Sequence, residues 1–307
     1  MKNKLRIGTR ESQLAVWQAT TVQQLLAAEG FESELVLIKS AGDIDQQTPL
    51  YDIGVQGIFT RSLDIALLNN RIDIAVHSMK DVPVQLPAGI VQAAVLKRAS
   101  YKDLFVYKNT DAFLQDPAAN AVIATSSIRR KAQWLHRYPH HTIENLRGNV
   151  NTRLQKVKDN HHWQGAIFAA AGLERIQLRP ENCVELDWML PAPAQGAIMV
   201  VCREDDHVCA AACMHFNDAG TALCVKIERD FLKTLLGGCS TPISALAEID
   251  NNTLIFKGNI VSPDGIKKYE VSSTVLTTLA ADTGMVAAIE ILEKGGQVIT
   301  DSIHHAK

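Results

Sequence analysis

The sequence lacks the features that mark membrane, secreted and disulfide-bonded proteins. No stretch approaches the roughly eighteen continuous apolar residues of a membrane-spanning helix, and no apolar run of signal-peptide length follows the opening MKNKLRIGTRES. Six cysteines in a chain of 307 residues do not indicate a disulfide framework. We therefore expect a cytoplasmic protein without a membrane partner.

The chain also lacks an excess of charge of either sign. Its 31 lysines and arginines face 33 acidic residues, so the formal net charge is −2. A protein that binds nucleic acid usually has a basic overall charge or aromatic side chains among its cations. Only Trp134 and Tyr138 lie near the basic stretch described below. These observations argue against a nucleic-acid partner, and any site for anions must be local.

Strand-like and helix-like segments alternate through the first two-thirds of the chain. LRIGTR predicts a strand, Ser12 can cap a helix that runs to about Glu29, and Gly30 can end that helix. A second series begins at the strand NAVIAT, after which Ser126 or Ser127 can cap the helix IRRKAQWLHRY. This alternation is typical of α/β units with a mainly parallel sheet. Residues 41–57 are expected to form a mobile loop.

The last third of the chain has a different pattern. Three strand-like runs, ISALAEI, TLIFKGNIV and KYEVSSTVL, precede a final helix from about Thr283 to Lys294. Strands followed by a helix predict a small α+β domain. The length of the chain is too great for one ordinary core, so two or three domains are expected.

A local charge imbalance is the first candidate site. Between residues 121 and 158 only Glu144 opposes eight cations. Arg129 and Arg130 open a predicted helix just after a strand, and Arg147 and Arg153 flank the start of another. Strand ends beside helix N-termini bind anions in α/β sheets, and arginine forks grip carboxylates. The alternative is a solvated basic face, which charge alone does not exclude.

Two further segments could carry chemistry. In VHSMKDVP, Lys80 and Asp81 follow a buried strand and would face a cleft, although a surface ion pair is the simpler interpretation. In LLGGCSTP, Cys239 follows two glycines in a flexible turn, where a thiol can be reactive; a small buried cysteine is the alternative. The cysteines and histidines between residues 202 and 215 lack the spacing of a zinc finger or ribbon, and no metal is expected.

Taken together, these segments resemble the porphobilinogen deaminase family along nearly the whole chain. The strings that carry the resemblance, in the family's order and spacing, are RIGTRESQLAVWQ, DIAVHSMKDVP, ATSSIRR, LRGNVNTRL, AAAGLER, LPAPAQGAI and LLGGCSTPI. The resemblance implies an α/β fold with two domains similar to type II periplasmic binding proteins, an active cleft between them, and a small C-terminal α+β domain. The implied limits are 1–97 with 194–217, 98–193, and 218–307.

The resemblance also implies an activity. The family consists of transferases of tetrapyrrole (haem) biosynthesis, usually monomeric, that condense four porphobilinogen molecules head to tail, release ammonia each time and yield hydroxymethylbilane. The reaction is primed by a dipyrromethane cofactor, made from the substrate and held by a thioether, here on Cys239. Asp81 matches the family's catalytic aspartate. It would stabilise the cation, spread onto the pyrrole nitrogen, that forms when ammonia leaves.

Each pyrrole brings an acetate and a propionate, so chain growth gathers carboxylates in one cleft and requires cations there. By resemblance, the residues that bind cofactor and substrate are Arg10, Ser12, Gln18, Lys80, Ser127, Arg129, Arg130, Arg147, Arg153, Arg175 and Gln195. The sequence departs from the family at four places. Gln56 stands where a lysine is frequent, Ala194 and Asn151 where glycines are frequent, and Leu236 where a glutamate is frequent.

One rival interpretation is a solute-binding protein for a small dicarboxylate, because the implied fold of the first two domains would suit it and fold does not fix function. That alternative predicts a secretory signal, and it assigns no function to Cys239. A second rival, a nucleic-acid binder that uses the basic stretch, is disfavoured by the negative net charge.

Overall fold

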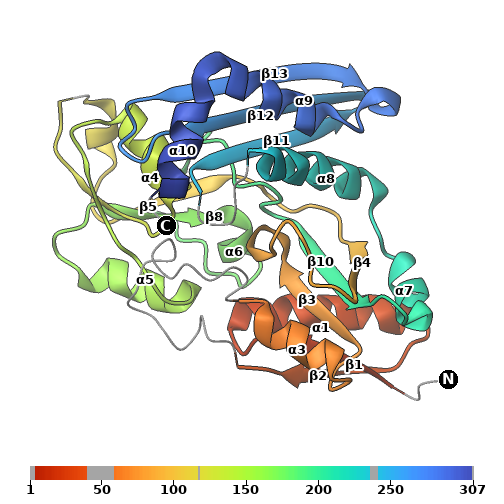
Figure 1. The fold of residues 1–307 in the computed structure, drawn as a ribbon. Helices are drawn as coiled ribbons and strands as arrows, with labels where there is room; N and C mark the ends of the chain where they lie inside the picture. Colours follow the sequence, from red (N-terminus) through yellow and green to blue (C-terminus); the bar gives the residue numbers. More distant parts are fainter. Residues whose placement is uncertain (1–3, 40–58, 117, 236–240, 306–307) are drawn as a thin grey trace.

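The computed structural model describes residues 4–39, 59–116, 118–235 and 241–305. In this part of the chain, strands form three separate sheets, which Figure 1 shows as three parts of the molecule. The first sheet has the order β2-β1-β3-β10-β4, the second β7-β6-β8-β5-β9, and the third β11-β12-β13. The loop expected at residues 41–57 lies outside the described residues.

The first sheet is built from distant parts of the sequence. Its strands are β1 (Leu5–Thr9), β2 (Ser33–Leu37), β3 (Ile74–Ser78), β4 (Ile90–Val95) and β10 (Ile198–Arg203), with helices α1 (Gln13–Ala28), α3 (Arg61–Leu68) and α7 (His207–Met214). The oxygen of Ser12 accepts the amide of Ala15 and caps α1 as predicted. β1 pairs in parallel with β2 and β3. β10 pairs antiparallel with β3 and β4.

The second sheet is also mixed. Its strands are β5 (Asp103–Tyr107), β6 (Val122–Ala124), β7 (Thr142–Glu144), β8 (Gly165–Ala169) and β9 (Cys183–Glu185), with helices α4 (Ile128–Arg137), α5 (Val150–Asp159) and α6 (Ala170–Glu174) and a short turn of helix at Ala112–Gln115. β6 is parallel to β7 and β8, whereas β5 is antiparallel to β8 and β9. Among the described residues, four of the five strands in each of these two sheets run in one direction, which agrees with the predicted mainly parallel pattern. The exceptions are β10 in the first sheet and β5 in the second, which run opposite to the strands beside them.

The third sheet confirms the predicted α+β pattern. Its antiparallel strands are β11 (Ile243–Asp250), β12 (Thr253–Val261) and β13 (Lys268–Leu276), with α8 (Ala219–Thr234), α9 (Thr283–Ile291) and α10 (Gln297–His305), and short helical turns at Thr277–Leu279 and Leu292–Gly296. α10 was not predicted. The helix expected to close the chain is interrupted at Gly295, whose φ of 104° suits glycine, and helical structure resumes beyond it.

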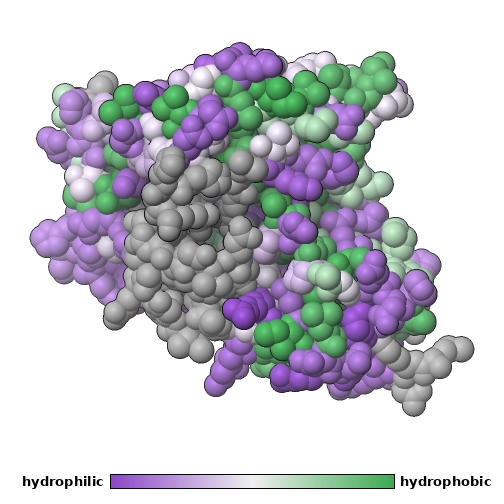
Figure 2. All heavy atoms as spheres, viewed as in Figure 1, coloured by the Kyte–Doolittle hydropathy of each residue, from purple (hydrophilic) through white to green (hydrophobic). Residues whose placement is uncertain are grey.

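Each sheet has its own apolar core. Buried residues form one cluster on each face of the first sheet, one on each face of the second, and one between the third sheet and its helices. On the face drawn in Figure 2, hydrophilic side chains are spread over all three parts, and apolar ones gather near the end of β13. The strand order supports the predicted domain limits, which stay a prediction.

A buried carboxylate joins the three parts. Glu228 of α8 is fully buried and accepts the guanidinium of Arg98 at 2.6 and 3.1 Å. It also accepts the amides of Ala194 and Ala247 at 2.6 and 2.8 Å. Arg98 and Ala194 lie on the two stretches of chain that cross between the first and second sheets, and Ala247 lies in β11. Glu228 thus fixes both crossings against the third sheet.

No single described helix is long and apolar enough to cross a membrane. α7 and α8 pass that test only as a pair, by length and composition, and a bend of 112° separates them.

Candidate active site

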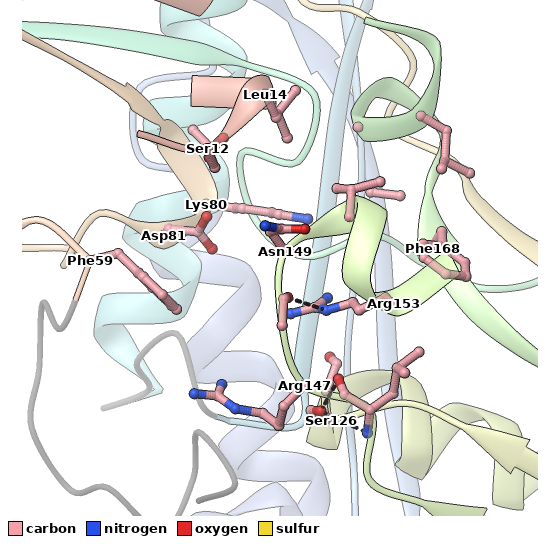
Figure 3. A pocket seen from close by; sticks show the side chains of 18 of the residues that line it. Ser12, Leu14, Phe59, Lys80, Asp81, Ser126, Arg147, Asn149, Arg153 and Phe168 are labelled. Atoms are coloured by element: carbon pink, nitrogen blue, oxygen red, sulfur yellow. Dashed lines mark hydrogen bonds between the residues drawn. The ribbon is translucent and has the colours of Figure 1, made fainter. Parts of the chain in front are cut away.

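A cavity of about 600 Å³ is lined by residues of the first and second sheets and the segments around them. Cavities of this size commonly hold small molecules. Among the described residues, its lining includes seven cationic side chains and two carboxylates: Arg10, Lys39, Lys80, Arg129, Arg130, Arg147 and Arg153, against Glu11 and Asp81. In Figure 3, Lys80 and Asp81 extend from one side toward Asn149, Arg153 and Arg147 on the other.

The wall from the first sheet is set by the ends of β1 and β3. Ser12, which caps α1, lines the cavity. Met79–Asp81 form a 3-10 turn directly after β3, and this turn brings Lys80 and Asp81 to the cavity. The guanidinium carbon of Arg10 lies 4.4 Å from the centre of the Phe59 ring, a cation–π contact within the lining.

Lys80 is held in place by Gln195. Its ammonium donates a hydrogen bond to Gln195 Oε1 at 3.2 Å. The pKa of Lys80 is lowered to about 8, mainly by burial; the nearby Arg130 and Arg129 also lower it, whereas Asp81 and Asp103 raise it. Lys80 therefore loses its charge in mildly alkaline solution, unlike an ordinary lysine.

The start of α4 is organised around Asp103, the first residue of β5. Asp103 Oδ2 accepts Arg129 at 2.7 Å, and Oδ1 accepts two guanidinium nitrogens of Arg130 at 3.1 and 2.7 Å. Gln195 Nε2 also donates to Oδ1, at 2.9 Å. Burial alone would raise the pKa of Asp103, but the two arginines outweigh it and hold that pKa well below its usual range. Asp103 is therefore a buried anion.

Cationic side chains gather differently at the start of α5. Asn149 caps this helix by accepting the amide of Thr152, and Arg153 Nε donates to Gly148 O at 2.7 Å. Burial, together with the positive charges of Arg130 and Arg147, lowers the pKa of Arg153 to about 10, although Asp81 opposes this effect. No ion pair joins Arg153 to a carboxylate within the described residues. This part of the cavity therefore favours an anionic ligand.

Ten of the sequence-predicted residues line the cavity: Arg10, Ser12, Lys80, Asp81, Ser127, Arg129, Arg130, Arg147, Arg153 and Gln195. Ser127 caps α4, which resolves the choice between it and Ser126. Ser126 lines the cavity too and exchanges hydrogen bonds with the backbone of Leu146. The predicted anchor, Cys239, lies outside the described residues.

Two predicted lining residues are not in the lining. Gln18 is buried behind it, where its amide hydrogen-bonds with Ser78 Oγ at 2.9 Å. Arg175 donates to Gly196 O at 2.7 Å and lies over the Trp17 ring, at 5.6 Å from its centre. The amide of Gln18 and one guanidinium nitrogen of Arg175 thus bond to neighbouring protein groups, and the predicted contact of these two residues with a ligand stays a prediction.

Sequence reasoning missed Asp103 and Phe59. Asp103 had a readable signal, because an acidic residue opens the otherwise apolar strand DLFVY and a buried carboxylate needs cationic partners. Its partners lie 26 and 27 residues further along the chain, which no local pattern indicates. Phe59 gave no signal beyond its place before α3.

Two departures from the family pattern have structural consequences. Ala194 has a φ of 62°, a left-handed conformation that glycine adopts more easily, in keeping with the glycine frequent there. Asn151 Nδ2 donates to Gln13 Oε1 at 2.9 Å, so α5 is joined to the start of α1 at the exposed edge of the cavity. Gln56 and Leu236 lie outside the described residues.

The described residues contain no group of three or more histidine, cysteine or acidic side chains arranged to hold a metal ion. The cysteines and histidines between residues 202 and 215 fall within this search, and Cys202, Cys209 and Cys213 are buried in the core of the first sheet.

Comparison with known proteins identifies two family models along the chain. "Porphobilinogen deaminase, dipyromethane cofactor binding domain" matches residues 5–211. "Porphobilinogen deaminase, C-terminal domain" matches residues 222–293. The first model includes every residue found in the cavity lining.

Curated relatives of this chain are also named porphobilinogen deaminase. The chloroplastic porphobilinogen deaminase of Oryza sativa subsp. japonica is 40% identical over 310 residues, which cover 97% of this chain and 86% of that protein. A porphobilinogen deaminase of Acidithiobacillus ferrooxidans is 37% identical over 312 residues and is matched over 100% of both chains. A solved nutrient binding protein from Burkholderia cenocepacia, bound to methionine, is only 15% identical, with a TM-score of 0.43 over 68% of this chain and 90% of that one.

Proposed function

This chain belongs to the porphobilinogen deaminase family, and on that premise we propose that the cavity between the first and second sheets is its active site. The enzyme is a transferase of tetrapyrrole biosynthesis. It condenses four porphobilinogen molecules head to tail with loss of ammonia and yields hydroxymethylbilane. The observation that carries the assignment of the site is the excess of seven cationic side chains over two carboxylates around one cavity.

The residues of the cavity fit a dipyrromethane cofactor, whose two rings each carry an acetate and a propionate. Lys80, Arg147 and Arg153 offer cationic donors, and the buried Nε of Arg129 has no hydrogen-bond partner among the described residues. An unmet buried donor is costly, so a carboxylate oxygen there would stabilise the site. When bound through Cys239, the cofactor supplies the pyrrole carbon that attacks the substrate.

The cationic side chains bind and orient the growing chain. Arginine and lysine neutralise carboxylates that would otherwise repel one another in a partly desolvated cavity. Ser12, Ser127 and Gln195 add uncharged hydrogen-bonding groups to the lining. Arg10 and Lys80 act from the first wall, and Arg129, Arg130, Arg147 and Arg153 from the second.

Asp81 acts on positive charge, whereas the cationic side chains act on the negative charge of the carboxylates. When ammonia leaves porphobilinogen, positive charge develops on the substrate and spreads to its pyrrole nitrogen. The Asp81 carboxylate, at the end of the turn after β3 and in the cavity lining, can stabilise that charge and accept or return the proton of a pyrrole N–H. The surrounding cations do not replace it, because they would repel the cationic centre.

The proposal further includes the three domains with the limits given above, a monomeric enzyme and a cytoplasmic location. The rice relative is named as chloroplastic, so membership of the family does not by itself fix the compartment. The strand order supports the domain limits, because β10 completes the first sheet after the chain has passed through the second.

The intact mass of the purified chain tests the proposal, with Cys239→Ala as the matched variant. We expect an added mass equal to two deaminated porphobilinogen units on the native chain and none on the variant. If the native chain is unmodified, incubation with porphobilinogen should add that mass and start turnover. A folded chain that gains no adduct and consumes no porphobilinogen would overturn the proposal.

A further inference from the structure

Hydrogen bonds join α8 to the segment that follows Asp81. Arg229, on α8, donates from its two terminal nitrogens to Val82 O at 2.9 Å and to Pro83 O at 2.5 Å. Val82 directly follows Asp81 and is buried in a core of the first sheet. On the other side of the turn, the amide of Met79 donates to Ala197 O at 3.1 Å. The turn that carries Lys80 and Asp81 is thus held from two directions.

α8 is itself firmly placed. Val225 packs into a core of the first sheet, while Ile227 and Phe231 pack into the core of the third. The helix ends at Thr234, five residues along the chain from Cys239. One helix therefore contacts the segment next to Asp81 and also leads into the segment that contains the cofactor-bearing cysteine.

Apolar packing between α8 and this segment is incomplete. A second cavity, of about 440 Å³, is lined by Met79, Val84 and Leu86 on one side and by Ala222, Leu223 and Arg229 on the other. Side chains that border a cavity restrain one another less than closely packed ones do. The two hydrogen bonds of Arg229 therefore add a directional link to the apolar contacts that Met79 and Val82 share with Val225 in one core.

We propose that Arg229 is a positioning residue that fixes the Asp81 turn relative to α8. This inference rests on the proposed function. In the reaction, Asp81 must face the reacting ring of a chain whose other end is fixed at Cys239. A small displacement of a catalytic group can cost up to about a hundredfold in rate, so the two hydrogen bonds that hold the Asp81 turn to α8 bear on turnover.

The test is a set of purified holoenzyme variants. Arg229→Met keeps the bulk of the side chain but cannot donate to the two carbonyls. We expect kcat to fall roughly tenfold, with KM changed less than about twofold and the bound cofactor retained by intact mass. The matched control is Lys226→Met, because Lys226 lies on the same helix, borders the same cavity and pairs with Asp230 on the helix itself. This control should keep wild-type kcat.

A double-variant cycle separates positioning from general stability. If Arg229 acts through Asp81, then Arg229→Met in an Asp81→Asn background should cost less than about twofold further in kcat. Losses that multiply in the double variant would overturn the inference, as would near-normal kcat in folded, cofactor-loaded Arg229→Met. Should that variant fail to fold, Arg229→Lys, which can reach one carbonyl at a time, is expected to lose kcat by a smaller factor. Full activity of Arg229→Lys would then contradict the inference.

The wild-type enzyme distinguishes the two proposals. A wild-type chain without adduct or turnover counts against the proposed function and removes the basis of this inference as well. A normal wild type beside an unaffected Arg229→Met counts against the positioning role alone.

Discussion

The starts of α4 and α5 bring the same residue type to the same cavity in different surroundings. At α4, Arg129 and Arg130 are buried and are matched by Asp103 at 2.7 Å each. At α5, Arg153 has no carboxylate partner among the described residues, and burial beside like charges lowers its pKa to about 10. The first pair is neutralised in part by the protein, whereas the second region leaves positive charge to be met by a ligand.

This difference shows how one cavity can be both stable and strongly cationic. A buried charge without a partner is costly, so the deepest arginines are supported by a fixed internal anion. Arg129 and Arg130 are thereby oriented before any ligand arrives. The region at α5 retains its excess charge, and we infer that it contributes most to the attraction of the substrate's carboxylates.

The largest expected effect comes from Asp81, a carboxylate in the lining of the same cavity. Asp81→Asn should lower turnover by about a hundredfold or more, because a fixed charge that stabilises the transition state is lost. The bound cofactor should remain, since Asp81 does not hold it covalently. Steady-state turnover and intact mass of the same sample check both statements. Near-normal turnover would contradict the role assigned to Asp81.

Asp103→Asn removes the counter-charge at α4. Because two buried arginines lose their anion, the free energy of unfolding should fall by about 3–5 kcal/mol. Urea unfolding measures this change. Asp187→Asn is the matched control, because Asp187 pairs with Lys102 at 2.7 Å but its side chain is 75% exposed. This control should cost less than about 1 kcal/mol, and equal losses in the two variants would contradict the importance of burial.

The lowered pKa of Lys80 predicts that kcat/KM declines on the alkaline side of its pH profile. Its charged form binds carboxylates, and that form is lost as the pH rises through its pKa of about 8. kcat/KM, which reports the free enzyme, should therefore decline above about pH 8. In Lys80→Arg the decline should move to higher pH, because arginine keeps its proton. An unchanged decline in this variant would show that another group titrates.

The smallest expected effect concerns the exposed link between α5 and α1. Asn151→Gly removes the hydrogen bond to Gln13, which should cost about 1 kcal/mol of unfolding free energy or less. KM should change less than about twofold, since neither side chain carries charge. Thermal unfolding and steady-state kinetics test this, with Gln13→Ala as the partner variant. A tenfold change in KM would mean that this link governs access to the cavity.

Local signals in the sequence were sufficient for several elements. Ser12 and Ser127 cap α1 and α4, and the three strands of the third sheet follow their alternating pattern. The direction of β10 was not predictable, because it depends on how the chain returns from the second sheet. α10 was missed because the glycines at 295 and 296 mark an end of helix by ordinary rules, yet helical structure continues beyond them.

The sequence located most residues of the candidate site but not their side-chain partners, and the reason is physical. Motif strings located the residues of both walls, including Lys80, Asp81 and Arg153. They could not show that Asp103 neutralises two of the arginines, since that contact joins β5 to α4 across 26 residues. Nor could they show that Gln18 and Arg175 bond to neighbouring protein groups instead of lining the cavity. Side-chain partners depend on tertiary packing, which local pattern does not encode.

The most direct test of the account compares Arg129→Met with Arg153→Met for unfolding free energy and kcat/KM. We predict that Arg129→Met loses about 2–3 kcal/mol of stability, because it breaks a buried charged pair. Arg153→Met should keep or slightly raise stability, because like-charge repulsion is relieved, while kcat/KM falls at least roughly tenfold. Equal loss of stability in both variants, with turnover retained in Arg153→Met, would contradict the division between the two regions.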